Sequence, residues 1–177
     1  MIQAKLYFDR ELPSGGAGIT PGIHANGDIQ YLGAEKSDTA WDLRFGNTTG
    51  QFIRKRLFEP NANYVNEGET PTEALQRSID KNVGIVVDIM RAVIGEAAKG
   101  VEAETYDEFV LKAANELKPY EGTPVCLKVL PDARNEKLYG KIPDYNFIDS
   151  YVQGFPTTLF WKKKEKELME KHGFSIE

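Results

Sequence analysis

Cysteine and histidine are scarce in this chain of 177 residues. Its single cysteine is Cys126, and its two histidines are His24 and His172. One cysteine excludes an internal disulfide, which is typical of proteins in a reducing compartment. So few cysteine and histidine side chains also argue against a structural zinc site, and we expect no metal-binding residues.

Long apolar runs are lacking as well. No stretch approaches the roughly 18 consecutive apolar residues that a membrane-spanning helix needs. The first ten residues, MIQAKLYFDR, contain no apolar segment of the kind found in signal peptides. The sequence therefore predicts a soluble, cytoplasmic protein with no membrane partner.

Positive charge is not in excess, because the formal net charge is -5. This excludes a uniformly basic nucleic-acid binder but leaves room for a local basic face. Hydrophobic residues make up 41% and charged residues 28% of the chain, which is ordinary for a globular protein. We expect residues 1–177 to form a single domain with a substantial core.

The most regular pattern lies in residues 28–60, DIQYLGAEKSDTAWDLRFGNTTGQFIRKRLFEP. Apolar and polar residues alternate on both sides of GNTTG, which predicts an antiparallel hairpin. Trp41, Leu43 and Phe45 share one side of the first strand and favour the core. The second strand has apolar and basic residues on one side, Phe52, Arg54, Arg56 and Phe58, opposite Ile53, Lys55 and Leu57.

The N-terminal part predicts a short strand over residues 4–8, which is followed by the segment LPSGGAGITPGIHANG. Its glycines suggest a phosphate-binding loop, but no Gly-Lys-Ser/Thr follows them. A flexible arm or turn is the better interpretation.

Two helices are predicted after the first hairpin. Thr70-Pro71-Thr72-Glu73 and Thr105-Tyr106-Asp107-Glu108 both fit capping boxes, each followed by apolar residues at helical spacing. The first helix is expected to close at Lys99-Gly100 and the second before Pro119. The helical part spans about 70–118, and a further helix is predicted over about 157–172.

Residues 123–130 and 138–142 predict a second hairpin around PDARNEK. The order is then three strands, two helices, two strands and a C-terminal helix. This order predicts a mainly β protein with some helix: a five-stranded barrel of the oligonucleotide/oligosaccharide-binding (OB) type, with a large helical insertion between strands three and four.

The segments WDLRFGNTTGQFIRKRLFEP and GTPVCLKVLPDARNEKLYGKIPDY flank this helical insert. In their order and texture they resemble single-stranded DNA-binding proteins of bacteriophages, over roughly residues 19–147. The resemblance implies a cofactor-free, non-enzymatic protein that coats single strands during DNA replication or recombination in the host cytoplasm, together with replication or recombination proteins. Many such proteins end in an acidic tail, whereas this chain ends in a lysine-rich helix and HGFSIE.

Charge is segregated along the chain in a way that suits a nucleic-acid binder. Residues 41–58 carry four basic residues against Asp42, whereas residues 70–118 carry nine acidic and six basic residues. Binding single strands requires cations along the backbone and aromatic rings for stacking. The candidate DNA-binding residues are Lys36, Arg44, Phe52, Arg54, Lys55, Arg56, Lys128, Arg134, Lys137, Tyr139 and Lys141, with Tyr31 and Tyr145 as further stacking candidates.

Other interpretations stay open. The triplet Arg54-Lys55-Arg56 also suits a charged cluster that protects a sheet edge, and Lys162-Lys163-Lys164 fits a solvated helix face. No catalytic residue is predicted, because neither histidine has a recognisable nucleophile context. The alternative function is a phage structural or assembly protein that works through protein contacts, and a monomer and a dimer are both compatible with the sequence.

Overall fold

The strands form two antiparallel sheets in the computed structural model, which describes residues 18–95, 100–134 and 137–176. The three-stranded sheet has the order β3 (Gln30–Lys36), β4 (Ala40–Gly46) and β5 (Phe52–Phe58). In the four-stranded sheet, β6 (Val125–Arg134) pairs with β2 (Gly22–His24), β7 (Lys137–Lys141) and β8 (Ile148–Ser150).

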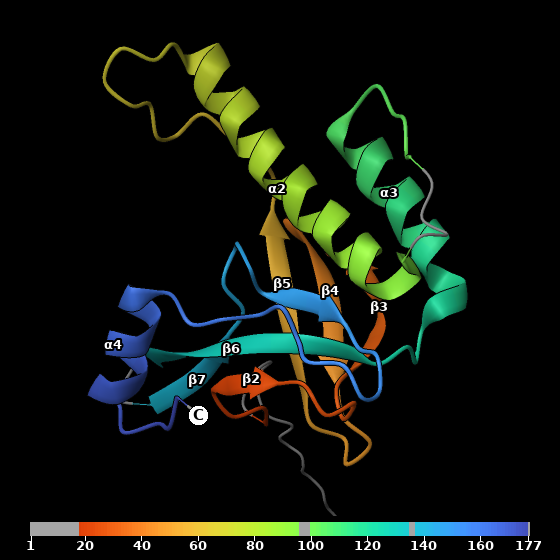
Figure 1. Ribbon diagram of the computed structural model, residues 1–177. Helices are drawn as coiled ribbons and strands as arrows, with labels where there is room; N and C mark the ends of the chain where they lie inside the picture. Colours follow the sequence, from red (N-terminus) through yellow and green to blue (C-terminus); the bar gives the residue numbers. More distant parts are fainter. Residues whose placement is uncertain (1–17, 96–99, 135–136, 177) are drawn as a thin grey trace, which may run out of the picture.

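Helices join and cover these sheets. They are α2 (Pro71–Ile94), α3 (Tyr106–Leu117), a short 3-10 turn η3 (Lys118–Tyr120) and α4 (Lys163–Lys171). Figure 1 shows α2 crossing the end of the three-stranded sheet with α3 beside it, while α4 lies near the β6–β7 end of the other sheet.

Both predicted helix starts are confirmed. The Thr70 hydroxyl accepts a hydrogen bond from the Glu73 amide at 3.1 Å, and the Glu73 carboxylate accepts one from the Thr70 amide at 2.8 Å. Thr105 caps α3 in the same way, but the Glu108 carboxylate bonds to the amide of Glu104 rather than that of Thr105. These bonds satisfy amides that the first helical turn leaves unpaired.

The predicted β4–β5 hairpin is confirmed, and the structure gives its register. Trp41 pairs with Leu57 and Phe45 with Ile53, so these apolar residues lie on one side of the sheet. In the turn, the side-chain oxygen of Asn47 accepts hydrogen bonds from the backbone amides of Thr49 and Gln51. An Asx-type turn of this kind explains why the GNTTG segment reverses the chain.

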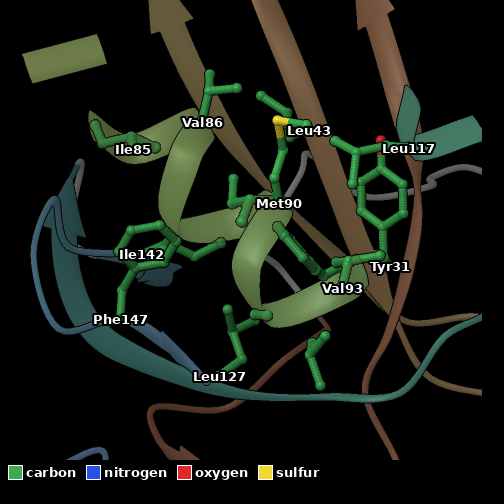
Figure 2. Close-up of a cluster of buried hydrophobic side chains, with 14 of the residues drawn as sticks. Tyr31, Leu43, Ile85, Val86, Met90, Val93, Leu117, Leu127, Ile142 and Phe147 are labelled. Atoms are coloured by element: carbon green, nitrogen blue, oxygen red, sulfur yellow. The ribbon is translucent and has the colours of Figure 1, made fainter. Parts of the chain in front are cut away.

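The core lies between the two sheets and is completed by α2. Figure 2 shows Met90 and Val93 of α2 among Tyr31 and Leu43 from the three-stranded sheet and Leu127 from β6. All five side chains are buried, so one hydrophobic cluster joins both sheets to the helix. Burial of this apolar area is the main force that holds the sheets together.

The prediction of a five-stranded OB-type barrel is wrong. Leu127 of β6 pairs with His24 of β2 and also with Ile148 of β8, so both edges of β6 are occupied there. Within the described residues, the backbone link between the sheets is one isolated bridge, Gln30↔Pro124, with a few hydrogen bonds of residues 122–125 to residues 29–31 around it, and no closed barrel forms. The helices therefore connect two separate sheets and are not an insertion in a barrel.

Smaller differences have local causes. β2 forms within the segment predicted as an arm, and β8 was not predicted, because each is only three residues long and depends on β6 as its partner. The C-terminal helix begins at Lys163 rather than near residue 157, since the Thr157 hydroxyl and the Thr158 amide both donate to the Asp149 carboxylate. The first long helix, α2, ends at Ile94 with Gly95 as its C-cap, earlier than the predicted end at Lys99-Gly100. The strand predicted for residues 4–8 lies outside the described residues.

Within the described part of the chain, no helix has the length and apolar character needed to cross a membrane.

Candidate functional site

Basic and aromatic side chains gather on the side of the β4–β5 hairpin that faces away from the core. We call this side the outer face, and its residues are Asp42, Arg44, Phe52, Arg54, Arg56 and Phe58. Strand periodicity places them there, since their neighbours Leu43, Ile53 and Leu57 are buried. The grouping predicted for β5 from its sequence is confirmed.

Asp42 organises two of the arginines. Its carboxylate accepts hydrogen bonds from Arg56 Nε at 2.8 Å and from Arg56 Nη2 at 2.7 Å. Arg54 Nη1 lies 3.7 Å from the same carboxylate. The hydrogen bond to Asp42 raises the pKa of Arg56. Asp42 thus holds Arg56 firmly and Arg54 loosely, which leaves Arg54 free to turn toward a ligand.

Arg44 and Arg54 lie directly opposite each other on the two strands. Like charges at such a position repel and destabilise the sheet. In addition, Arg44 Nε is buried without a hydrogen-bond partner among the described residues. Glu35 of β3 pairs with Asp42 of β4. This second acid limits the positive charge at the end of the outer face where Asp42 and Arg56 lie. The Glu121 carboxylate lies beside Gly33, the β3 partner of Arg44, so an anion at this end of the outer face fits best on the Arg54 side of Arg44.

Lys55 does not lie on the outer face, although the sequence grouped it with Arg54 and Arg56 as a DNA-binding residue. Its Nζ donates to the carbonyl oxygen of Ile142 at 2.8 Å and to the Asp144 carboxylate at 2.6 Å. Burial lowers the pKa of Lys55 despite the opposing effect of Asp144. Burial alone would raise the pKa of Asp144, but the hydrogen bond and charge of Lys55 outweigh it and lower that pKa. Lys55 is a buried structural cation.

Lys128, another predicted DNA-binding residue, is completely buried. Its Nζ donates to Glu165 at 2.8 Å and to the Asn146 side chain at 2.9 Å. The same Nζ lies 5.6 Å from the ring centroid of Phe160 and 5.9 Å from that of Trp161. Lys128 therefore fastens α4 and the segment before it to β6.

Lys36 and Lys141 are exposed but lie apart from the outer face. Lys36 pairs with Trp41, so it shares the core side of the sheet, and its Nζ is 3.9 Å from the Asp107 carboxylate. Lys141 ends β7, where it pairs with Leu130. The structure does not bring these two lysines together with Arg54.

Arg134, Lys137 and Tyr139 belong to the β6–β7 hairpin, where Arg134 pairs with Lys137 and Tyr139 with Asp132. Their side chains lie outside what the structure describes. Of the further stacking candidates, Tyr31 is buried in the core and Tyr145 is 58% exposed. Burial raises the pKa of Tyr31, as does the charge of Glu121.

A groove of about 870 Å³ begins where the outer face ends. Arg56 and Phe58 belong to both, and the groove continues along the loop of residues 59–70, α2 and Tyr145. Figure 1 shows that this loop extends from the tip of β5 to the start of α2. The sequence patterns did not predict the groove, because it depends on the position of α2 beside β5.

Side chains of α2 fix the backbone of the groove wall. Asn82 donates to the carbonyl oxygen of Phe58 at 2.9 Å, and Ser78 accepts from the Asn61 amide at 3.3 Å. Arg77 donates to the carbonyl oxygen of Tyr64 at 2.9 Å. The backbone is thus anchored at three places between residues 58 and 64.

The aromatic rings of this wall remain in solvent. Phe58 is 61% exposed and Tyr64 is 86% exposed. Sequence reasoning missed Tyr64, although an aromatic residue within the polar run NANYVNEGE was a signal that its ring has no core position.

A metal centre is not apparent in residues 18–95, 100–134 and 137–176, where no three His, Cys, Asp or Glu side chains are grouped closely enough to hold an ion. The acidic residues at the start of α3 serve the helix, since Glu108 accepts hydrogen bonds through its carboxylate from the Glu104 amide and lies 3.3 Å from Lys112.

Comparison with known proteins assigns no family to this chain. Neither the scan against protein-family models nor the search of curated proteins found a match. The outer face and the groove are therefore interpreted from their own geometry and charge.

Proposed function

We propose that the protein binds single-stranded DNA without catalysing a reaction on it. The observation that carries this proposal is the row Phe52, Arg54, Arg56 and Phe58 on the outer face of β5. Aromatic rings stack on bases with about 1–3 kcal/mol each, and arginines bind phosphates with charge-assisted hydrogen bonds. The row places its two arginines between two aromatic rings.

The geometry of the row favours a single strand over a duplex. Residues two apart on a strand are about 7 Å apart, so the row extends over roughly 20 Å, enough for a few nucleotides. Its exposed ring, Phe58, needs the face of a base, which a duplex keeps inside its stack. A phosphate between Arg44 and Arg54 would also relieve the repulsion of these two residues.

Fluorescence anisotropy with labelled oligo-dT, oligo-rU and a DNA duplex tests the proposal. We expect oligo-dT to bind more tightly than the duplex, and more weakly at about 200 mM than at about 50 mM salt, because binding releases counterions. The oligo-rU titration reports whether the face distinguishes DNA from RNA. Failure of oligo-dT to bind at low salt, or equal binding of the duplex, would contradict the proposal.

The variant that combines Arg44→Gln with Arg54→Gln addresses the phosphate contacts. Loss of two contacts should reduce the slope of log K against log salt by about 1.4, at roughly 0.7 for each phosphate on a single strand. The control combines Lys163→Gln with Lys166→Gln, two exposed lysines of α4, and removes the same charge elsewhere. An equal change of slope in both variants would show that only net charge matters.

A second function, assembly through protein contacts, is favoured by one observation. Val152, Phe155 and Phe160 are exposed on the segment before α4, and Phe155 is 74% exposed. Several exposed apolar side chains on one segment can mark a surface for protein contacts.

Two matched phenylalanine variants separate these functions. Phe58→Ala should weaken oligo-dT binding by about 1–3 kcal/mol and leave the oligomeric state unchanged. Phe155→Ala should have no effect on oligo-dT binding if DNA binding is the function. If assembly is the function, light scattering should show that the wild type is an oligomer and that Phe155→Ala dissociates it. In that case neither the wild type nor Phe155→Ala should bind oligo-dT.

A further inference from the structure

The groove beside β5 continues directly from the outer face. Phe58 is the last residue of β5 and its ring contacts Arg56, whose Cζ lies 6.0 Å from the ring centroid. Both residues line the groove, which leads on to Tyr64 and Tyr145. A strand that leaves the outer face at Phe58 would therefore enter the groove.

The backbone that carries the Tyr64 ring is held in place. Arg77 donates to the Tyr64 carbonyl oxygen and is itself held by two hydrogen bonds of 3.0 Å to Glu69. Tyr145 also lines the groove, with Lys162 Nζ 5.6 Å from its ring centroid, and is 58% exposed. Because the backbone of Tyr64 is already ordered, a base that stacks there does not have to order the loop, which lowers the cost of binding.

Charge distinguishes the groove from the outer face. Four basic and four acidic side chains line it, so its walls carry no net charge. Its cations are also engaged: Arg77 pairs with Glu69, and Lys81 Nζ lies 3.8 Å from the Asp144 carboxylate. A balanced lining does not attract phosphates, whereas exposed aromatic rings attract bases whatever their sequence.

We infer that the groove is a second subsite for the same DNA strand, in which bases stack on Tyr64 and Tyr145 and few phosphate contacts form. This inference rests on the proposed function, since the outer face delivers the strand to the groove at Phe58. The two subsites then differ in kind. Binding to the outer face depends on salt, and binding to the groove adds affinity that salt hardly changes.

The test compares the wild-type protein with the variant that combines Tyr64→Ala and Tyr145→Ala, with Phe155→Ala as control. Anisotropy is measured with a short and a long oligo-dT at two salt concentrations. For the long oligomer, affinity should fall at least about fivefold for each ring, with an unchanged salt slope. The short oligomer, which the outer face holds alone, should lose much less. Phe155→Ala should bind both oligomers as the wild type does.

The outcomes separate the two proposals. If the wild type fails to bind oligo-dT, the proposed function fails. If it binds and the double variant binds equally well, the groove is not on the path of the strand. A salt slope that falls together with affinity would show that the groove takes phosphates, which overturns base stacking there.

Photocrosslinking gives a second readout that does not depend on the double variant. A long oligonucleotide with 5-iododeoxyuridine near one end should crosslink to Tyr64 or Tyr145 in the wild type, as mapped by mass spectrometry of the peptides. Crosslinks confined to the β5 peptide would contradict the second subsite. The single variant Tyr64→Ala serves if the double variant is unstable, because Tyr64 is 86% exposed.

Discussion

Two lysine residues that count as surface cations in the sequence are buried in ion pairs in this protein. Lys55 follows Arg54 directly, yet its side chain lies on the opposite side of the sheet. There it pairs with Asp144, which is 89 positions away in the sequence. Lys128 bonds to Glu165 at a separation of 37 positions. A local charge count includes both as surface cations. Only their distant partners show that they stabilise the fold.

Removal of the Lys128 charge should reduce stability rather than DNA affinity. Lys128→Met leaves Glu165 without its partner, and loss of one member of a buried ion pair costs about 3–5 kcal/mol. Urea unfolding should show this loss, whereas Lys163→Met, at an exposed position of α4, should change stability little. Glu165→Gln in the Lys128→Met background should restore part of the stability. A stable Lys128→Met variant that has lost oligo-dT binding would assign this lysine to the site instead.

At the level of elements, α2 supports the groove as well as the core. Its inner face contributes Ile85, Ile89 and Met90 to the core. Another face presents Arg77, Ser78 and Asn82 to the backbone of residues 58–64. The sequence predicted the start of this helix through its capping box, and its apolar spacing indicated the buried face. The polar contacts could not be predicted, since hydrogen bonds to a loop backbone leave no periodic signal.

Arg77→Ala should release the loop of residues 59–70. The variant loses the bonds to Glu69 and Tyr64, and because these bonds lie at the protein surface, global stability should fall little. Hydrogen exchange should accelerate at the amides of residues 61–69, and binding of long oligo-dT should weaken because Tyr64 is no longer held in place. Lys112→Ala on α3 is the control, since its Nζ bonds to the carbonyl oxygen of Glu102, away from the loop. Unchanged exchange in the loop would show that other contacts fix it.

At the scale of the whole molecule, one core joins two sheets that do not merge into a barrel. The predicted OB-type barrel required β6 to close onto the first three strands. Instead β2 and β8 occupy its edges at Leu127. These strands are three residues long, too short for an alternating pattern to be recognised. Contact between the sheets is made by side chains in the core, which α2 completes, and by the short backbone link between residues 29–31 and 122–125.

Because one core joins both sheets to α2, we expect both sheets to unfold together. Ile89 of α2 is fully buried, and Ile89→Ala should cost about 2–5 kcal/mol. Trp41 lies in the three-stranded sheet, and Trp161 lies beside Lys128 of β6. In a Trp161→Phe background the fluorescence of Trp41 reports on the three-stranded sheet, and in a Trp41→Phe background that of Trp161 reports on the four-stranded sheet. The urea midpoint should shift equally in both backgrounds and by circular dichroism. A shift seen by only one tryptophan would show that the sheets unfold separately.

The sequence by itself determined the local elements: the β4–β5 hairpin with its outer row, the capped starts of α2 and α3, and the hairpin of β6 and β7. Alternation, helical spacing and capping act over a few residues, so they are visible in the chain. Tertiary structure alone decided which strands pair with β6, which lysines are buried in ion pairs, and that α2 forms a groove beside Phe58 and Tyr64. These features join residues far apart in the chain, and no local pattern encodes them.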